Sequence, residues 1–224
     1  MQIVLSQPDG IHLPAQALLQ ELAEDETLHQ FGGGLVSQAL SEPGLLNLAA
    51  RSLAETLHQP ELSAISALVT PLLVLDGEIQ AFVDGEKRIF SLPGFFGYRS
   101  RLPLDKFPLS AVRLPPLNPD GRYFFSSIAM NQYLAARMDI HPTLKIAGHV
   151  RVAISNPKQL PQRLEAIEGR LERQVLEDGL IEMAVDAGRK TLVEPLGDLE
   201  TAALINVLKK LRDSVIQNGD FRPS

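Results

Sequence analysis

The sequence of 224 residues contains no cysteine. The chain therefore cannot form a disulfide, offers no thiolate nucleophile, and cannot supply cysteine ligands to zinc or to an iron–sulfur cluster. Long apolar runs are also missing, since none approaches the roughly 20 residues that are needed to cross a bilayer. The first ten residues, MQIVLSQPDG, lack the basic start and the long apolar stretch of a secretory signal. From these absences we expect a cytoplasmic protein that has no membrane partner.

Local motifs for catalysis and metal binding are absent as well. The serine motif GxSxG does not occur, and none of the five histidines forms a pair such as HExxH or HxH. The carboxylates Glu165, Glu168 and Glu172 lie at helical spacing among arginines, which is typical of a solvent-exposed helix face with internal ion pairs. The sequence therefore predicts no metal site and no cofactor, and it favours a protein that is not an enzyme.

Basic residues are scarce in the first part of the chain. Residues 1–86 contain 12 acidic residues and one basic residue, Arg51, which gives a net charge of −11. Residues 87–151 contain 10 basic and 3 acidic residues and carry +7, whereas residues 152–224 carry −2. The overall net charge of −6 thus conceals two neighbouring blocks of opposite sign.

A glycine run interrupts the acidic part, within the stretch HQFGGGLVSQ at residues 29–38. A phosphate-binding loop would need a preceding strand and a following lysine, but three carboxylates stand at 24–26 and the first basic residue is Arg51. Consecutive glycines also lose much conformational entropy in any regular element. We therefore expect a break between two helices that serves as a hinge or allows a close backbone crossing.

The periodicity of apolar residues predicts an α+β protein. Residues 1–70 form the expected acidic helical subdomain, because leucines recur there at helical spacing. Residues 71–224 form the expected α+β domain. Its first part, residues 71–138, is a basic and aromatic β-meander with a proline-rich extension, and its second part, residues 139–224, is a βαββα unit.

Turn signals give the expected elements of the second domain. Two Asp-Gly dipeptides, at 76–77 and 84–85, predict a three-stranded meander over residues 72–92, which leads into the proline-rich extension at 93–121. A short helix is expected near residues 128–137.

The βαββα unit is expected to begin with a strand over residues 144–155, where apolar and polar residues alternate. A helix should then open at Pro161, and a hairpin should surround residues 186–190. Asp198 is the expected N-cap of the last helix.

Aromatic and basic residues gather in the middle of the chain, where ten of the 12 aromatic residues fall between residues 82 and 133. Aromatic rings and arginines are enriched at protein–protein interfaces. The leading hypothesis is therefore a non-enzymatic binding or assembly protein that docks an acidic protein surface, or a second copy of itself, through this segment. The expected binding residues are Phe95, Phe96, Tyr98, Arg99, Arg101, Lys106, Phe107, Arg113, Lys145, His149 and Arg151.

Three alternatives remain open. The same rings and cations could bind RNA or single-stranded DNA, although the acidic first block disfavours this. Asp139, His141 and His149 could belong to an enzyme of unknown class, if the fold brings them together. The basic block could also be neutralised by the acidic block within the molecule, which would leave no charged docking surface.

Overall fold

The computed structural model of the chain describes residues 3–59, 62–98, 107–141, 143–156, 159–190, 192 and 195–214. The strands within these residues are β1 (Leu5–Gln7), β2 (Gly10–Pro14), β3 (Glu78–Val83), β4 (Glu86–Ser91), β5 (Leu109–Leu114), β6 (Gly121–Ala129), β7 (Gln132–Ile140), β8 (Ala147–Asn156) and β9 (Gln159–Arg163). The helices are α1 (Leu19–Ala23), α2 (Glu26–Gln30), α3 (Leu35–Leu40), α4 (Pro43–Leu46), α5 (Leu53–Leu57), α6 (Leu62–Val74), α7 (Leu92–Tyr98), α8 (Glu165–Leu171), α9 (Asp178–Arg189) and α10 (Asp198–Asp213), with a 3-10 turn, η1 (Phe31–Gly34), between α2 and α3.

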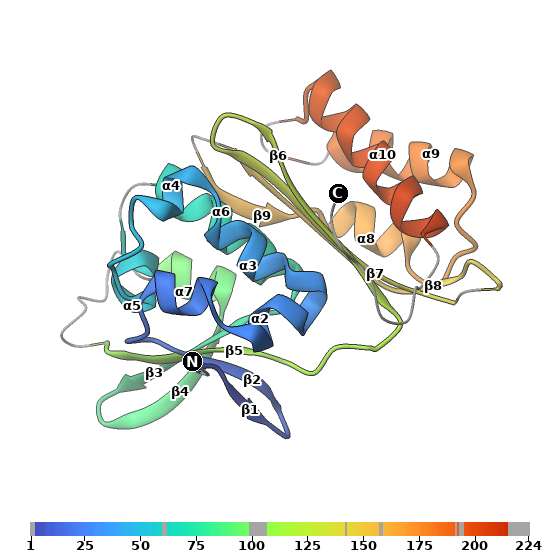
Figure 1. The fold of residues 1–224 in the computed structure, drawn as a ribbon. Helices are drawn as coiled ribbons and strands as arrows, with labels where there is room; N and C mark the ends of the chain where they lie inside the picture. The colour runs from blue at the N-terminus through green and yellow to red at the C-terminus, as the bar shows by residue number, and fades with distance from the viewer. Residues whose placement is uncertain are drawn as a thin grey trace.

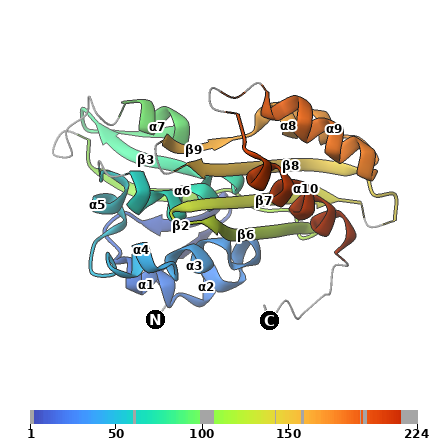
Figure 2. The same ribbon diagram turned by 90° about the horizontal axis from the view of Figure 1, so that it is seen from above.

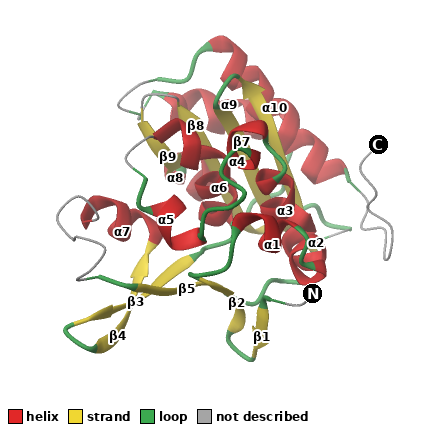
Figure 3. Ribbon diagram, turned by 60° about the vertical axis from the view of Figure 1, so that its left-hand side comes forward, coloured by secondary structure: helices red, strands yellow, loops and turns green. Residues whose placement is uncertain are grey.

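The described strands form two antiparallel sheets. The first sheet has the order β1-β2-β5-β3-β4, so β2 of the amino-terminal hairpin pairs with β5, which begins 95 residues after β2 ends (109 − 14). The second sheet has the order β6-β7-β8-β9 and runs along the chain without a crossover. Figure 3 shows the first sheet at one end of the molecule and the second sheet between helices.

The second sheet is covered on both faces. Helix α6 packs along β7, β8 and β9 on one face, while α8 and α10 pack on the other face, with α9 against both of these helices. Figure 1 shows the two helical layers with this sheet between them, and Figure 2 shows the same order from above. Burial on both faces explains why β7 has a continuous run of buried residues from Tyr133 to Ile140 instead of an alternating pattern.

Alternate residues of β7 enter two different cores. Tyr133 and Ala135 join the cluster that surrounds α6, whereas Leu134, Ala136 and Met138 join the cluster beneath α8, α9 and α10. This division follows from the period of two in a strand, since successive side chains point to opposite faces. The second sheet is therefore the wall between the two hydrophobic cores.

The α+β class predicted from the sequence is confirmed, and several expected elements are present. The acidic part contains the short helices α1 to α5, and the Asp84-Gly85 turn joins β3 to β4 as predicted. The strand expected at 144–155 is β8, and the last helix is α10, with Gly197 rather than Asp198 at its N-cap position.

Other predicted elements are wrong. The first expected strand of the meander is the end of helix α6, so Asp76-Gly77 closes a helix instead of a hairpin. The helix expected near 128–137 is a hairpin between β6 and β7, in which Asn131 has a left-handed φ of 58°. The expected hairpin around 186–190 belongs to helix α9.

The boundary expected at residue 70 falls inside α6, and a division of the chain into two folding units remains a prediction. Among the described residues, no helix has the length and apolar character that a membrane crossing requires.

Candidate functional site

The most polar group of buried side chains surrounds Asp76, at the carboxyl end of α6. The amide N–H groups of Asp76 and Gly77 donate to the carbonyls of Leu73 and Leu72 at 3.3 and 2.8 Å, which closes the helix with a Schellman motif. Asp76 adopts the left-handed conformation that this motif requires, with a φ of 53°. The turn aims its carboxylate at the second sheet.

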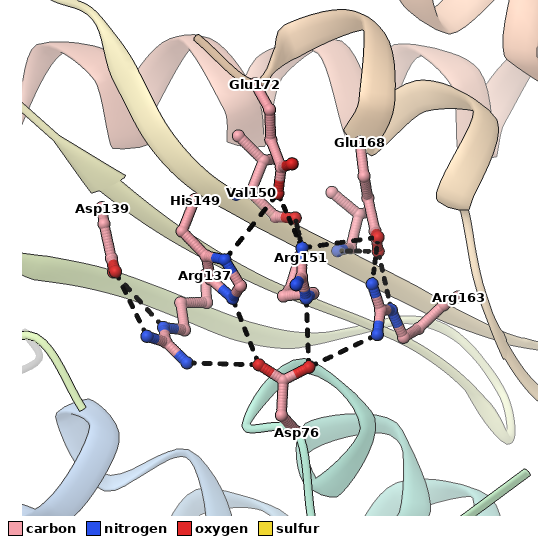
Figure 4. Close-up of polar contacts among 10 residues, drawn as sticks. Asp76, Arg137, Asp139, His149, Val150, Arg151, Arg163, Glu168 and Glu172 are labelled. Carbon is pink, nitrogen blue, oxygen red and sulfur yellow. Dashed lines mark hydrogen bonds and ion pairs between the residues drawn. The ribbon is translucent and has the colours of Figure 1, made fainter. Parts of the chain in front are cut away.

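Four donors from three strands converge on this carboxylate (Figure 4). His149 Nε2 lies 3.1 Å from Asp76 Oδ2, and Arg137 Nη1 lies 3.5 Å from the same oxygen. Arg151 Nε and Arg163 Nη1 donate to Asp76 Oδ1 at 3.0 and 3.3 Å. All four donors stand on the face of the second sheet that is turned toward α6.

Each guanidinium has a second carboxylate from the carboxyl-terminal half. Arg137 Nε lies 3.3 Å from Asp139 on the same strand, Arg151 Nη1 lies 2.7 Å from Glu172, and Arg163 Nε lies 3.1 Å from Glu168. Glu168 also accepts the Val152 amide at 2.9 Å, and Glu172 accepts the Val150 amide at 3.1 Å. The three guanidinium groups, His149 and the four carboxylates form a single network, which we call the Asp76 cluster.

The electrostatics of the Asp76 cluster favour the ionised forms. Burial alone would raise the pKa of the Asp76 carboxyl, but the hydrogen bonds from His149 and Arg151 and the charges of Arg151 and Arg163 outweigh it, so this pKa is lowered. Burial also opposes ionisation of Glu172, yet the Val150 amide and Arg151 lower its pKa. Burial would lower the pKa of Arg163, and its bond to Glu168 raises it. A carboxylate held in this way is a weak base, so the cluster is suited to holding charges in place.

The glycine run packs beside the Asp76 cluster. Gly32, Gly33 and Gly34 all adopt left-handed conformations, with φ of 58°, 62° and 71°. A Cβ on Gly32 would lie 2.8 Å from Leu75 Cδ2, and one on Gly33 would lie 2.9 Å from Tyr123 Cβ. The predicted break between two helices is present, and the glycines allow its close approach to the end of α6 and to β6. Burial here raises the pKa of Tyr123 to about 12.

The aromatic residues of the predicted binding segment lie inside the protein. Phe95 and Phe107 are each 1% exposed, and Phe96 is 8% exposed. Phe95 and Phe107 stack with ring centroids 6.1 Å apart, beneath the first sheet and its helices. These rings are core residues and present no docking surface. Tyr98 ends α7, and its side chain falls outside the described part of the structure, as do Arg99, Arg101 and Lys106.

The remaining predicted binding residues contact groups of the same chain. Arg113 donates to Glu78 at 2.8 Å and to Asp9 at 3.3 Å. Lys145 caps the end of α10 through the carbonyl of Arg212 at 3.2 Å. His149 and Arg151 belong to the Asp76 cluster. Acidic residues of the first block thus neutralise part of the basic block within the molecule.

The candidate catalytic residues are directed to separate partners. Asp139 and His149 are opposite each other on β7 and β8, but Asp139 bonds Arg137 while His149 bonds Asp76. His141 lies at an exposed turn, where its Nδ1 accepts the Leu144 amide at 3.1 Å. No group of three or more metal-ligating side chains is suitably arranged among the residues that the structure covers.

Sequence reasoning missed three of the four carboxylates of the Asp76 cluster, all but Asp139. Asp76 was assigned to a hairpin turn, and Glu168 and Glu172 were assigned to a solvent face, although Glu168 is only 3% exposed. Arg163 is 87 residues from Asp76 along the chain. No spacing in the sequence signals a contact at that distance.

The fold resembles chains of known oxidoreductases, although no protein-family model and no curated protein matches the sequence. A chain of quinoline 2-oxidoreductase from Pseudomonas putida 86 superposes with a TM-score of 0.73 at 14% identity, over 93% of this chain and 77% of that chain. A chain of carbon monoxide dehydrogenase from Hydrogenophaga pseudoflava gives 0.69 at 16% identity, over 94% of this chain and 76% of that chain. A chain of CO dehydrogenase from Oligotropha carboxidovorans gives a TM-score of 0.70 at 13% identity, over 93% of this chain and 76% of that chain.

These resemblances correct the functional hypothesis. The prediction of a non-enzymatic protein that docks an acidic surface is wrong, as is the alternative of RNA or single-stranded DNA binding, because the structural neighbours are parts of redox enzymes. The physical reason lies in the predicted segment itself. Among the predicted binding residues, Phe95, Phe96 and Phe107 lie in the core, and Arg113 and Arg151 bind carboxylates of the same chain.

Proposed function

We propose that this chain is a subunit of an oxidoreductase that is assembled from several chains. The observation that carries the proposal is the resemblance in fold over 93–94% of the chain to quinoline 2-oxidoreductase and to carbon monoxide dehydrogenases. These neighbours have different substrates in their names but the same class of reaction. Their shared fold is therefore better explained by a common structural role in redox enzymes than by a common substrate.

A role in assembly around a redox centre fits the composition of the chain. Because the chain has no cysteine, a cysteine-ligated cluster would have to be held by another subunit. One structural neighbour is described as a Cu,Mo-CO dehydrogenase, and another as a carbon monoxide dehydrogenase that lacks the Mo-pyranopterin moiety of its molybdenum cofactor. The partner that we propose is accordingly a metal-bearing chain of the same oxidoreductase.

The shared part of the fold includes most of each neighbouring chain. This chain accounts for 76–77% of the length of the chains that it resembles. The second sheet and its two helical layers make up a large part of the described structure, so they belong to what is shared. We propose that this layered unit is the scaffold on which the partner subunit assembles.

The test is purification of the tagged full-length chain from its native host at physiological salt, followed by native mass determination and metal analysis. We expect a stoichiometric complex that contains molybdenum or iron and reduces an artificial electron acceptor when its substrate is added. The same tag on an unrelated protein serves as the control. A chain that elutes alone, or only with copies of itself, and carries no metal would overturn the proposal.

A further inference from the structure

We propose that strands β7, β8 and β9 form a binding site for a small carboxylate anion, and that Asp76 is the resident ligand of this site. The donors of the site are Arg137, His149, Arg151 and Arg163. The inference concerns the chemistry of this chain alone and does not rest on the proposed function.

The donors converge on one point from the same face of the sheet. They come from β7, β8 and β9, whereas Asp76 comes from the end of α6, more than 60 residues earlier in the chain. Its two oxygens receive two contacts each, within 3.0 to 3.5 Å. Figure 4 shows this carboxylate on one side of the donors and the glutamates of α8 and the turn after it on the other side. Guanidinium groups suit planar carboxylates because they can offer two parallel donors.

The donors are held in place by groups other than Asp76. Asp139 binds Arg137, Glu172 binds Arg151, and Glu168 binds Arg163, all from the carboxyl-terminal half. The side chain of Arg137 is only 7% exposed, and that of Glu168 is 4% exposed. Each of the three guanidinium groups therefore has a second anchor besides Asp76, and His149 Nδ1 lies 3.8 Å from Glu172. A site whose donors have such anchors is preorganised for another ligand.

Glycine can replace Asp76 without a change in the backbone dihedral angles at that residue. Asp76 stands where a Schellman motif favours glycine, and its φ of 53° is one that glycine adopts readily. The substitution Asp76→Gly removes a CH₂–COO⁻ group, whose atoms correspond to acetate. The side chain of Asp76 is 30% exposed, so a small anion can reach the position from solvent.

The chain supplies a matched control for this substitution. Asp84 has the same φ of 53° and is also followed by glycine, but it lies at the exposed turn between β3 and β4. Asp84→Gly therefore makes the same chemical change in the same backbone conformation, away from the cluster.

The experiment is a thermal unfolding series of the wild-type chain, Asp76→Gly and Asp84→Gly at pH 7 in sodium acetate, against sodium chloride of equal ionic strength. At acetate concentrations about tenfold above the dissociation constant, we expect the Tm of Asp76→Gly to rise by about 3–6 °C more than that of the two other proteins. Any general stabilisation by acetate should affect all three alike. An equal response in all three proteins would overturn the proposal.

Two further arms make the result specific. Asp76→Asn keeps the position filled with a neutral amide, so acetate should not raise its Tm beyond that of Asp84→Gly. Phosphate should stabilise Asp76→Gly less than acetate does, and an equal or larger effect would contradict a site for carboxylates. If Asp76→Gly is unfolded in chloride, the same titration is followed by far-UV circular dichroism. Recovery of the wild-type signal in acetate supports the site, and failure to recover it contradicts the site.

Discussion

The two faces of the second sheet are built in different ways. The face toward α8 and α10 is largely apolar, with Leu134, Met138 and Val152 each 0% exposed. Its buried charged residue is Arg122 of β6, which donates to the carbonyls of Leu211 and Arg212 at the end of α10 at 2.8 and 2.7 Å. The face toward α6 is apolar only near Tyr133 and carries the charged residues of the Asp76 cluster at its other end. The two faces of the same strands are thus packed in different ways, mainly by apolar contacts on one face and partly by ion pairs on the other.

This contrast explains how the helices on each face are held against the second sheet. Apolar burial is strong but has little directional preference, so on this side the direction comes from the hydrogen bonds that Arg122 and Lys145 donate to carbonyls at the end of α10. The Asp76 cluster is directional, because each guanidinium must meet oxygens at defined positions. We infer that the apolar face supplies most of the stability and that the charged end sets how the end of α6 meets the sheet.

The largest expected effect comes from the apolar face. Leu134→Ala removes a fully buried side chain between the sheet and α10, and should lower the free energy of unfolding by about 2–5 kcal/mol. Leu199→Ala is the control, because that side chain is 63% exposed, and it should change stability by less than about 0.5 kcal/mol. Urea unfolding measures both. If Leu134→Ala and Leu199→Ala lowered the free energy of unfolding equally, the apolar face would not contribute the stability that we infer.

A smaller effect is expected where the glycine turn meets the charged face. Gly33→Ala should cost about 2–4 kcal/mol, since the new methyl group would be strained at a φ of 62° and would also meet Tyr123. Gly85→Ala carries the same kind of strain at a φ of 80°, but a Cβ there meets nothing within 4 Å. It should cost only about 1–2 kcal/mol. The difference between the two measures the packing of the turn against β6.

Low pH should weaken the interactions of the Asp76 cluster and should leave the packing on the apolar face of the second sheet unaffected. The pKa values of Asp76 and Glu172 are lowered in the folded protein, so their contribution is complete above the unfolded-state values and is lost as the pH falls through the folded-state values. Urea midpoints should therefore decline below about pH 4 more steeply for the wild type than for Asp76→Asn. Parallel curves for the two proteins would show that Asp76 contributes nothing that depends on its charge.

The smallest effect is expected for an ion pair outside both faces. Arg88 and Glu86 lie 3.5 Å apart on the exposed strand β4, with side chains 55% and 76% exposed. Arg88→Ala should change the free energy of unfolding by less than about 0.5 kcal/mol, because water screens such pairs. A larger change, measured by urea unfolding, would mean that exposed charges contribute as much as the Asp76 cluster.

The fold was predictable where local signals decide it. Asp84-Gly85 between two short runs specified a hairpin, and the alternation over residues 144–155 specified β8. The same dipeptide at Asp76-Gly77 was misread, because a short apolar run before a turn fits a buried helix end as well as a strand. Pro71 also lies inside α6, and proline is disfavoured in a helix interior.

The site was only half predictable. The alternation over residues 144–155 correctly placed His149 and Arg151 on one face of β8, and both are among the expected binding residues. The carboxylate that they bind is that of Asp76, 73 residues from His149 and 75 from Arg151, and such pairings depend on tertiary packing. The aromatic residues were wrongly predicted to form a docking surface for a related reason, since rings suited to an interface are equally suited to a core.

The central claim is that the Asp76 carboxylate fixes the end of α6 on the charged face of the second sheet. The most direct measurement is the difference in unfolding free energy between Asp76→Gly and Asp84→Gly, since their backbone conformations match at a φ of 53°. Removing one partner from a buried ionic group costs several kcal/mol, and partial exposure reduces that cost, so we predict that Asp76→Gly is less stable by about 2–3 kcal/mol. Equal stability of the two variants, within about 0.5 kcal/mol, would contradict the claim.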